Sequence, residues 1–417
     1  MQKLTSENLQ DIIVRSLNHM DSRLTGHGER VAYGTLLMLE QDSRFSYDDI
    51  CKITWTVLLH DIGSFHKITD ISDLLKTEND SSFSHAHYGS LFLKYFSPYP
   101  EYAPIVYYHH SDYKSIESSD MDQKMAWVSK CLQVLDAADL YHVSHPEATA
   151  EQFLYFLSRL DTNHYSKEAV EAVSGTIRQG HVMQNARMDI HKELLQYLSK
   201  MDVTEKEKSA LLQTLVSSID FRSHYTALHC AVMVHVSDML GRLCGLDGNA
   251  REVLHVGATL HDLGKIAIPV EVLESPGRLQ GEDWEIMKSH VVITEEILKG
   301  RVPDDVLRVA VRHHETLSGT GYPRGLKADE LSLPERIVAV ADIVSALSEE
   351  RSYKSAFPLE EVLRILWDMA DNGRICKEVV RILDDNKEDI YQAARAVGRK
   401  TAEMYEKIYR EYKLAES

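Results

Sequence analysis

The sequence lacks several features that mark whole classes of protein. None of its apolar runs approaches about 18 residues, so we expect no membrane span. The first residues, MQKLTSENLQDIIVRSL, lack the apolar core of a signal peptide. The five cysteines are scattered along the chain and form no CxxC pair. We therefore predict a cytoplasmic protein whose thiols are reduced and mostly buried.

Positive charge is also scarce. The 417 residues include 46 Lys and Arg against 64 Asp and Glu, which gives a net charge of −18. This balance argues against DNA or RNA as a partner, because such partners are bound through a basic face. A small anionic ligand stays compatible with it, because bound metal cations reverse the field locally.

The sequence also has no alternating apolar run long enough to suggest a substantial sheet. Helical periodicity runs through most segments, so we predict an all-α fold. Thr204 and Glu207 form a capping-box pattern at a helix start, Pro334 fits another helix start, and Gly245 fits a helix stop. Residues 387–414 read as a charged amphipathic helix.

What the sequence does contain is one ordered set of His and Asp residues, present twice. The successive gaps are 33, 25, 24 and 26 residues upstream and 32, 29, 23 and 28 residues downstream. The upstream copy comprises His27, His60, Asp61, His85, His109, His110 and Asp136. The downstream copy comprises His229, His261, Asp262, His290, His313, His314 and Asp342. A repeat of this kind indicates two copies of one helical domain that binds metal.

We therefore predict two tandem helical domains joined by connecting helices. The first spans residues 1–150, the helical connector spans 151–215, and the second domain with its C-terminal helices spans 216–417. The connector is neither Gly/Ser-rich nor Pro-rich, so we do not expect a flexible linker there.

The mixed His and Asp set suits Fe, Mn, Ni, Co or Zn, and the pattern alone does not choose among them. Seven ligands are too many for one tetrahedral ion and suit two octahedral ions. Adjacent helical residues point about 100° apart, so the pairs His261-Asp262 and His313-His314 can reach two neighbouring ions, with Asp262 as a bridge. Two ions roughly 3.5–4 Å apart clamp the attacking and leaving oxygens of phosphoryl transfer. The pattern therefore predicts hydrolysis at phosphate.

Around the downstream ligands the sequence reads LHDLGKIAIP and HHETLSGTGYPRGL. With its HDxGK, MKxH, HHE and GxGYP motifs and the Asp in VAVADIVSAL, the segment from Asp220 to Tyr353 resembles the HD-GYP phosphodiesterases, a branch of the HD superfamily of metal-dependent phosphohydrolases. The resemblance implies two tandem HD-type domains and a homodimer. It also implies two divalent transition-metal ions, Fe or Mn first, with Ni, Co or Zn as alternatives.

The activity implied by the resemblance is hydrolysis of a bacterial cyclic dinucleotide, c-di-GMP or 3′,3′-cyclic GMP-AMP. The products would be the linear dinucleotide and then mononucleotides. Two other readings stay open. One is a sensor that binds a cyclic dinucleotide without cutting it, and the other is an HD-type nucleotide phosphohydrolase.

The resemblance also assigns roles to individual residues. One ion would be held by His229, His261, Asp262 and Asp342, and the other by Asp262, His290, His313 and His314. Asp262 and Lys265 would be the catalytic residues, with Lys265 meeting a phosphate oxygen. Substrate would be bound by Lys265 together with Gly321, Tyr322, Pro323 and Arg324, the last of which would approach a phosphate or a guanine edge.

Three positions depart from the family pattern. Ser318 stands where the family often has Asp, and Ser223 replaces another frequent Asp. Asp220 stands where many members have a Glu that binds a third metal ion, so a third ion held by Asp220 is an open expectation.

The upstream copy has the ligands without their usual surroundings. Ser64 replaces the lysine of HDxGK, and SDYKSIESSD follows His109-His110 in place of a Glu and a GYP loop. This half resembles a plain HD domain, with a regulatory or structural role, a separate hydrolytic activity or an empty site as its alternatives. His85 is preferred to His87 as the third ligand, because Gly89 then falls four residues after it, as Thr294 does after His290.

Overall fold

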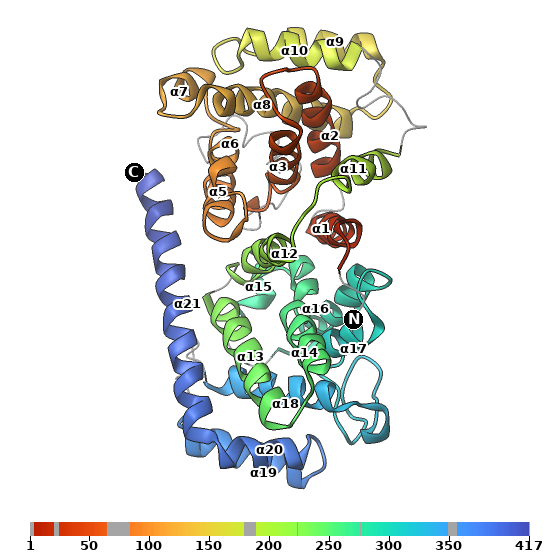
Figure 1. Ribbon diagram of the computed structural model, residues 1–417, viewed down its shortest axis with the longest axis vertical. Helices are drawn as coiled ribbons and strands as arrows, with labels where there is room; N and C mark the ends of the chain where they lie inside the picture. The colour runs from red at the N-terminus through yellow and green to blue at the C-terminus, as the bar shows by residue number, and fades with distance from the viewer. Residues whose placement is uncertain are drawn as a thin grey trace. The chain divides into compact units, whose positions relative to one another are not determined.

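The protein is described here as a computed structural model, in which helices dominate (Figure 1). The structure describes residues 4–20, 25–64, 84–178, 189–222, 224–275, 277, 279–348 and 357–416. Within these ranges the only β-type pairing is an isolated bridge between Ser318 and Lys327. The all-α prediction is therefore confirmed. No helix in the described ranges combines the length and the hydrophobicity needed to span a bilayer.

The chain divides into two compact units. The N-terminal unit comprises Thr5–Ser218 with Tyr412–Ser417, and the C-terminal unit comprises Met1–Leu4 with Ile219–Glu411. The predicted connector, residues 151–215, lies within the N-terminal unit, where its helices pack on α2 and α8. The division into 1–150, 151–215 and 216–417 stays a prediction, and the structure itself marks one boundary, at Ser218.

The N-terminal unit is built around α2 and α8, which contact each other and most of the neighbouring helices. Its elements are α1 Ser6–Met20, α2 His27–Glu40, α3 Tyr47–Leu58, α5 Ser84–Phe96, η3 Pro100–Tyr102, α6 Ala103–Tyr107, α7 Tyr113–Ser118, α8 Gln123–Ser144, α9 Ala150–Ser158, α10 Lys167–Arg178, α11 Ile190–Leu198 and α12 Glu205–Asp220.

The C-terminal unit is built around α13, which packs against both α14 and α18 (Figure 1). Its elements are α13 His224–Leu243, α14 Gly248–Leu260, η4 Leu263–Ala267, α15 Val270–Leu273, α16 Gly281–Leu298, α17 Asp304–Val311, η5 Ala328–Glu330, α18 Leu333–Ser348, α19 Leu359–Asp371, α20 Lys377–Asp385 and α21 Lys387–Glu416.

Local sequence signals set several of these helix ends. The Thr204 N–H donates to the Glu207 carboxylate at 2.8 Å and the Glu207 N–H donates to the Thr204 hydroxyl at 3.3 Å, so the predicted capping box is confirmed. Gly245 adopts a φ of 74° just after α13, as the predicted helix stop requires. Pro334 is the second residue of α18. All five cysteines are free thiols, and only Cys244 is not fully buried.

The predicted amphipathic tail is α21, which runs along the C-terminal unit. The Tyr405 ring stacks on Phe221 with centroids 5.1 Å apart, and Gly398 approaches Val232. These contacts bury one face of a helix whose other face is charged.

Helices α14 and α17 cross closely because α14 has a glycine at the contact. A Cβ on Gly257 would lie 2.5 Å from Val309 Cβ. We therefore expect Gly257→Ala to lower the free energy of unfolding by about 1–3 kcal/mol, the usual cost of overpacking a core. Urea unfolding followed by circular dichroism measures the change.

Gly248 is the matched control, because it starts the same helix and a Cβ there would meet nothing within 4 Å. Gly248→Ala should leave stability almost unchanged. Equal effects of the two substitutions would contradict the packing argument.

Candidate metal centre and pocket

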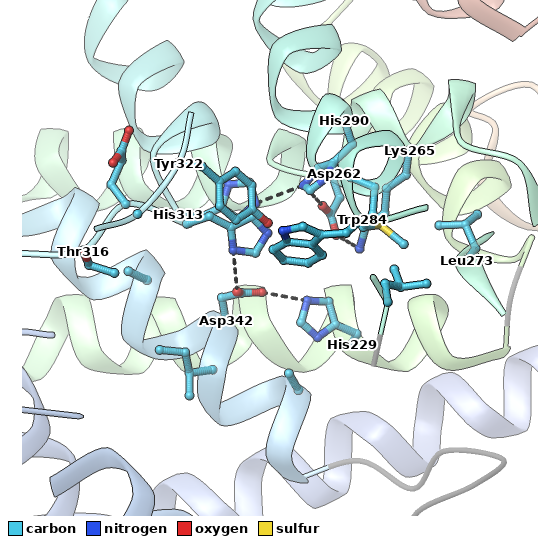
Figure 2. A pocket seen from close by; sticks show the side chains of 18 of the residues that line it. His229, Asp262, Lys265, Leu273, Trp284, His290, His313, Thr316, Tyr322 and Asp342 are labelled. Atoms are coloured by element: carbon cyan, nitrogen blue, oxygen red, sulfur yellow. Dashed lines mark hydrogen bonds and ion pairs between the residues drawn. The ribbon is translucent and has the colours of Figure 1, made fainter. Parts of the chain in front are cut away.

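The seven downstream side chains converge on one buried spot inside the C-terminal unit (Figure 2). These side chains come from five helices or the residues that directly follow them. His229 lies on α13, His261 and Asp262 follow α14, His290 lies on α16, His313 and His314 follow α17, and Asp342 lies on α18. The convergence predicted from sequence is therefore present in the fold.

The carboxylate of Asp262 lies between two groups of ligands. Its Oδ2 is 3.0 Å from His261 Nε2, and its Oδ1 is 3.4 Å from His290 Nε2. Across the site, Asp342 Oδ1 is 3.0 Å from His229 Nε2 (Figure 2). An aspartate whose two oxygens face different imidazoles has the arrangement needed to bridge two ions.

The ligand atoms separate into two sets, each with its atoms within 4.8 Å of one another. One set is His229, His261 and Asp262, and the other is His290, His313 and His314. This separation matches the two-ion assignment made from the family resemblance, although the ligand roles themselves stay predictions.

Backbone oxygens orient three of the imidazoles. Nδ1 of His261, His290 and His313 donates to the carbonyl three residues earlier, at 2.7, 2.5 and 2.8 Å. Each Nε2 is left with its lone pair directed into the cluster, which is how metal-binding histidines are usually held. The buried Nε2 of His261 has no hydrogen-bond partner among the described residues. The donor set therefore fits divalent transition metals.

The charge states also suit a cation. Burial alone would raise the pKa of Asp262, but His261 and Lys265 hold it well below its usual range. Burial lowers the pKa of His290 to about 3 and lowers that of His313 well below its usual value. At neutral pH Asp262 is therefore ionised and the imidazoles of His290 and His313 are neutral, the forms that bind metal.

The glycine of the HD motif lets the ligand-bearing segments approach. A Cβ on Gly264 would overlap the carbonyl oxygen of His290 on α16. In the N-terminal unit a Cβ on Gly63 would overlap the carbonyl oxygen of His85 on α5. The two units thus share the same close packing, and it selects His85 as the counterpart of His290. His87 instead stacks on Tyr107, with centroids 4.3 Å apart.

Glu315, the last residue of the HHE motif, holds the GYP loop. Its buried carboxylate accepts the N–H of Arg324 at 2.7 Å and the N–H of Leu326 at 2.9 Å. A Cβ on Gly321 would lie 2.5 Å from the carbonyl oxygen of His314. The loop is therefore fixed directly over the metal-binding pair. Sequence reasoning gave Glu315 no role, although its place in the motif was a signal.

A cavity of about 1010 Å³ opens beside the cluster. Its wall includes ligand residues, Lys265, Gly321 and Tyr322. The ring of Tyr322 lies 4.7 Å from that of His314 and meets Trp284 edge-on at 5.8 Å (Figure 2). Trp284 and Arg374 also line the cavity, and sequence reasoning missed both of them. Both lie outside the repeated set of metal-binding residues.

Three of the predicted site residues lie elsewhere. The guanidinium of Arg324 pairs with Glu295 at 2.6 Å and does not line the cavity, and neither does Pro323. The side chain of Asp220 is buried and accepts a hydrogen bond from the Cys230 thiol. Burial raises the pKa of Asp220 to about 7. Among the described residues Asp220 joins neither ligand set, so a third ion stays a prediction.

Two further positions complete the comparison with the family pattern. The hydroxyl of Ser318 lies 2.9 Å from that of Thr320 in the GYP loop. Ser223 lies outside the described residues, as does Tyr353 at the end of the matching segment.

Arg222 braces the turn that carries Lys265. Its guanidinium donates to the carbonyl oxygens of Lys265 and Ile266 at 2.7 and 2.8 Å and to that of Ile268 at 2.9 Å. The Lys265 oxygen also accepts the Ile268 N–H at 3.0 Å, and all three oxygens lie at or just after the end of the short helix η4, which ends at Ala267. The buried arginine therefore fixes the end of the HDxGK segment.

The upstream residues converge in the same way within the N-terminal unit. His27 Nε2 is 3.2 Å from His60 Nε2 and 3.3 Å from Asp61 Oδ2, and His85 Nε2 is 2.8 Å from His110 Nε2. Two of the sets formed there are His27, His60 and Asp136, and His85, His109 and His110. The upstream ligand set is therefore as complete as the downstream one.

Comparison with known proteins agrees with this picture of two related metal sites. A family model described as HD domain matches residues 203–379, and another with the same description matches residues 25–144. The two halves of the chain are thus each an HD domain, a metal-dependent helical fold.

Relatives with assigned activities cover most of the chain. The chain is 25% identical to the 3′3′-cGAMP-specific phosphodiesterase 1 of Vibrio cholerae, over 92% of both sequences. It is 34% identical to the cyclic di-GMP phosphodiesterase response regulator RpfG of Xanthomonas campestris, over 48% of this chain and 52% of that one. The chain thus spans about half the length of the second relative.

A crystal structure of the cyclic GMP-AMP-specific phosphodiesterase V-cGAP3 of V. cholerae shares the fold. Its TM-score is 0.58 at 19% identity, and the match covers 92% of this chain and 97% of that one. The chain therefore carries two HD-domain matches in tandem, and it is homologous to the HD-GYP phosphodiesterases over most of its length.

Replacing Arg222 with Ala would remove the guanidinium donor from three carbonyl oxygens at the HDxGK turn, one of which, that of Lys265, keeps the Ile268 N–H as a backbone donor. We expect the free energy of unfolding to fall by about 2–4 kcal/mol, because each unsatisfied buried acceptor costs roughly 1–3 kcal/mol and the turn can relax. Urea unfolding of the metal-free protein measures the loss.

Arg364→Ala is the control, because Arg364 is exposed and, within the described part of the chain, forms an ion pair only with its helix neighbour Glu361. It should change stability by less than about 0.5 kcal/mol. If Arg222→Ala were as mild as Arg364→Ala, the bracing role would be wrong.

Proposed function

We propose that the C-terminal unit hydrolyses a 3′,5′ phosphodiester bond of a bacterial cyclic dinucleotide, with c-di-GMP and 3′,3′-cyclic GMP-AMP as the candidate substrates. The observation that carries the proposal is the convergence of the seven His and Asp side chains, six of which line one cavity together with Lys265. The homologous proteins act on these same dinucleotides, which supports the choice of substrate class.

The seven residues would hold two divalent ions, and Fe or Mn agree best with the resemblance. When bound, such a pair supplies an acidified water and neutralises charge on the phosphate. Lys265 contributes a fixed ammonium group whose Nζ lies 2.5 Å from Asp262 Oδ2. Because Asp262 holds it at the edge of the cluster, this ammonium can meet a phosphate oxygen and stabilise the charge that develops there.

The cavity wall provides contacts for the two halves of a dinucleotide. A volume of about 1010 Å³ is at the upper end of the range for small-molecule sites, which suits a ligand with two bases. Trp284 and Tyr322 offer aromatic faces on which a base can stack. The GYP loop, with Gly321 and Pro323, would keep Tyr322 in place.

A cyclic dinucleotide carries two phosphates, and only one of them can occupy the metal centre. The second one needs its own cation. Arg374 lines the cavity and makes no ion pair with any described residue, so we assign it to the second phosphate or to a base edge. The same role for Arg324 stays a prediction that requires its guanidinium to leave Glu295.

Some expectations are not addressed by these observations. The homodimer, the absence of DNA or RNA partners, the cytoplasmic location and the third ion at Asp220 stay predictions.

Asp262→Asn should abolish turnover and lower the metal content, because it removes the bridging charge. Lys265→Ala should keep the metal and lower kcat about 10²–10³-fold, as expected for loss of one charge-stabilising group. Chromatographic detection of linear product from c-di-GMP, 3′,3′-cyclic GMP-AMP and c-di-AMP, under Mn²⁺ and under anaerobic Fe²⁺, measures turnover. Metal content is read on the same samples.

Two results would contradict this assignment. If metal content falls as far as activity in Lys265→Ala, the lysine is not acting on substrate. If the metal-loaded wild-type protein binds a dinucleotide but releases no linear product with either metal, the protein is a sensor.

Arg374→Ala should raise KM about tenfold or more with little change in kcat, because a charge-assisted hydrogen bond to the substrate contributes roughly 1.5–3 kcal/mol. Lys377→Ala is the control, since Lys377 is exposed nearby and pairs with Asp371. Steady-state kinetics on the preferred dinucleotide distinguish the two. An unchanged KM in Arg374→Ala would remove this residue from the substrate site.

A further inference from the structure

We propose that the N-terminal unit holds a second metal centre, which binds divalent cations more tightly than the downstream centre and so fills first. Its role is to stabilise the fold of the N-terminal unit and not to hydrolyse the dinucleotide. The inference concerns residues that the proposed phosphodiesterase does not use. Three observations carry it: lone pairs that face each other, an added carboxylate clamp and an unbalanced local charge.

The first observation is that acceptor atoms face one another. Nδ1 of His27 is bonded to Asp139 at 2.7 Å, and Nδ1 of His60 is bonded to the Val57 carbonyl at 2.8 Å. The Nε2 atoms of the two rings therefore face each other, 3.2 Å apart, and Asp136 Oδ1 lies 3.2 Å from His27 Nε2. Buried acceptors in this arrangement need a positive species among them, which a divalent cation supplies in place of a proton on one of the rings.

The second observation is a carboxylate clamp. Asp139 is fully buried, and its two oxygens accept from Arg30 Nε at 2.6 Å and Nη2 at 2.9 Å while it also holds His27. A carboxylate behind a metal-binding imidazole fixes the ring and raises its basicity, which strengthens metal binding about 10–100-fold. In the C-terminal unit the corresponding place, three residues after Asp342, is Ser345, whose hydroxyl donates to the backbone oxygen of His229.

The third observation is the charge balance. Downstream, the ammonium of Lys265 contacts the bridging Asp262 and competes with a metal ion for Oδ2. Upstream, Ser64 takes the place of that lysine, and no Lys or Arg of the described ranges pairs with Asp61 or Asp136. The upstream cluster therefore has more uncompensated negative charge, and it should take up a cation first.

The same features indicate that this metal site has a structural role in its own unit. The site lacks the lysine that would stabilise charge on a substrate. The stretch after His110 is bound into its own unit, where the Ser111 carbonyl accepts from Gln133 at 2.7 Å and the Tyr113 N–H donates to the His164 carbonyl at 3.0 Å. The donors come from five separate segments between residues 27 and 136, so bound ions would cross-link them.

The experiment is a Mn²⁺ titration of the chelator-stripped full chain, with free Mn²⁺ read from its electron paramagnetic resonance signal. We expect two classes of site in the wild-type protein. The tighter class should disappear in Asp61→Asn and persist in Asp262→Asn. Because metal binding is measured and turnover is not, failure of the phosphodiesterase proposal leaves this test intact.

The opposite pattern, in which Asp262→Asn removes the tighter class and Asp61→Asn does not, would overturn the inference. So would a wild-type protein that binds no more Mn²⁺ than Asp61→Asn. Circular dichroism of each variant reports whether it is folded.

A second variant keeps every ligand in place. Asp139→Asn should retain the number of bound ions and weaken the tighter class about 10–100-fold. Asp112→Asn is its control, because Asp112 also bonds a histidine, His164 at 2.6 Å, but at an exposed position away from the cluster. If Asp139→Asn binds Mn²⁺ as tightly as Asp112→Asn, the clamp has no part in metal binding and the proposal is wrong, even if Asp61→Asn fails to fold.

Discussion

The structure depends on one constraint: buried imidazoles must keep their Nε2 lone pairs pointed at a common spot. In the downstream site the backbone carbonyl oxygens of Ala258, Met287 and Ala310 meet this requirement by occupying the Nδ1 side of each ring. Each ring is thereby held by the helical segment that carries it. Each ligand direction is thus set by local helix geometry, and the helix packing sets the distances between ligands.

The packing that brings the ligands together follows from the same requirement. Gly264 lets the HDxGK turn lie against the backbone of α16, and Gly321 lets the GYP loop lie against the HHE segment. Arg222 then stabilises the HDxGK turn by donating to its carbonyl oxygens, and Glu315 stabilises the GYP loop by accepting from its N–H groups. The glycines and the glutamate of these motifs therefore allow close packing and stabilise the segments, in addition to any chemical role of the motifs. The result is an open cavity on one side of a rigid cluster.

Much of this could be predicted from the sequence, because His, Asp and Gly at fixed spacings reflect local geometry. The all-α fold, both ligand sets and the choice of His85 over His87 came from spacing. Contacts between distant side chains could not be read in this way. Glu295 captures Arg324 from another helix, Arg374 reaches the cavity from the loop after α19, and Asp139 clamps His27 across the N-terminal unit. Such pairings depend on tertiary packing, which spacing alone does not encode.

The central claim is that the downstream His and Asp residues hold a pair of divalent cations beside the cavity. Anomalous diffraction from crystals of the Mn²⁺-loaded full chain tests it most directly. The account predicts two anomalous peaks in the C-terminal unit, one among the Nε2 atoms of His229 and His261 and one among His290, His313 and His314, with Asp262 between them. Diffraction that places no ion within this cluster, while the side chains stay where the structure has them, would contradict it.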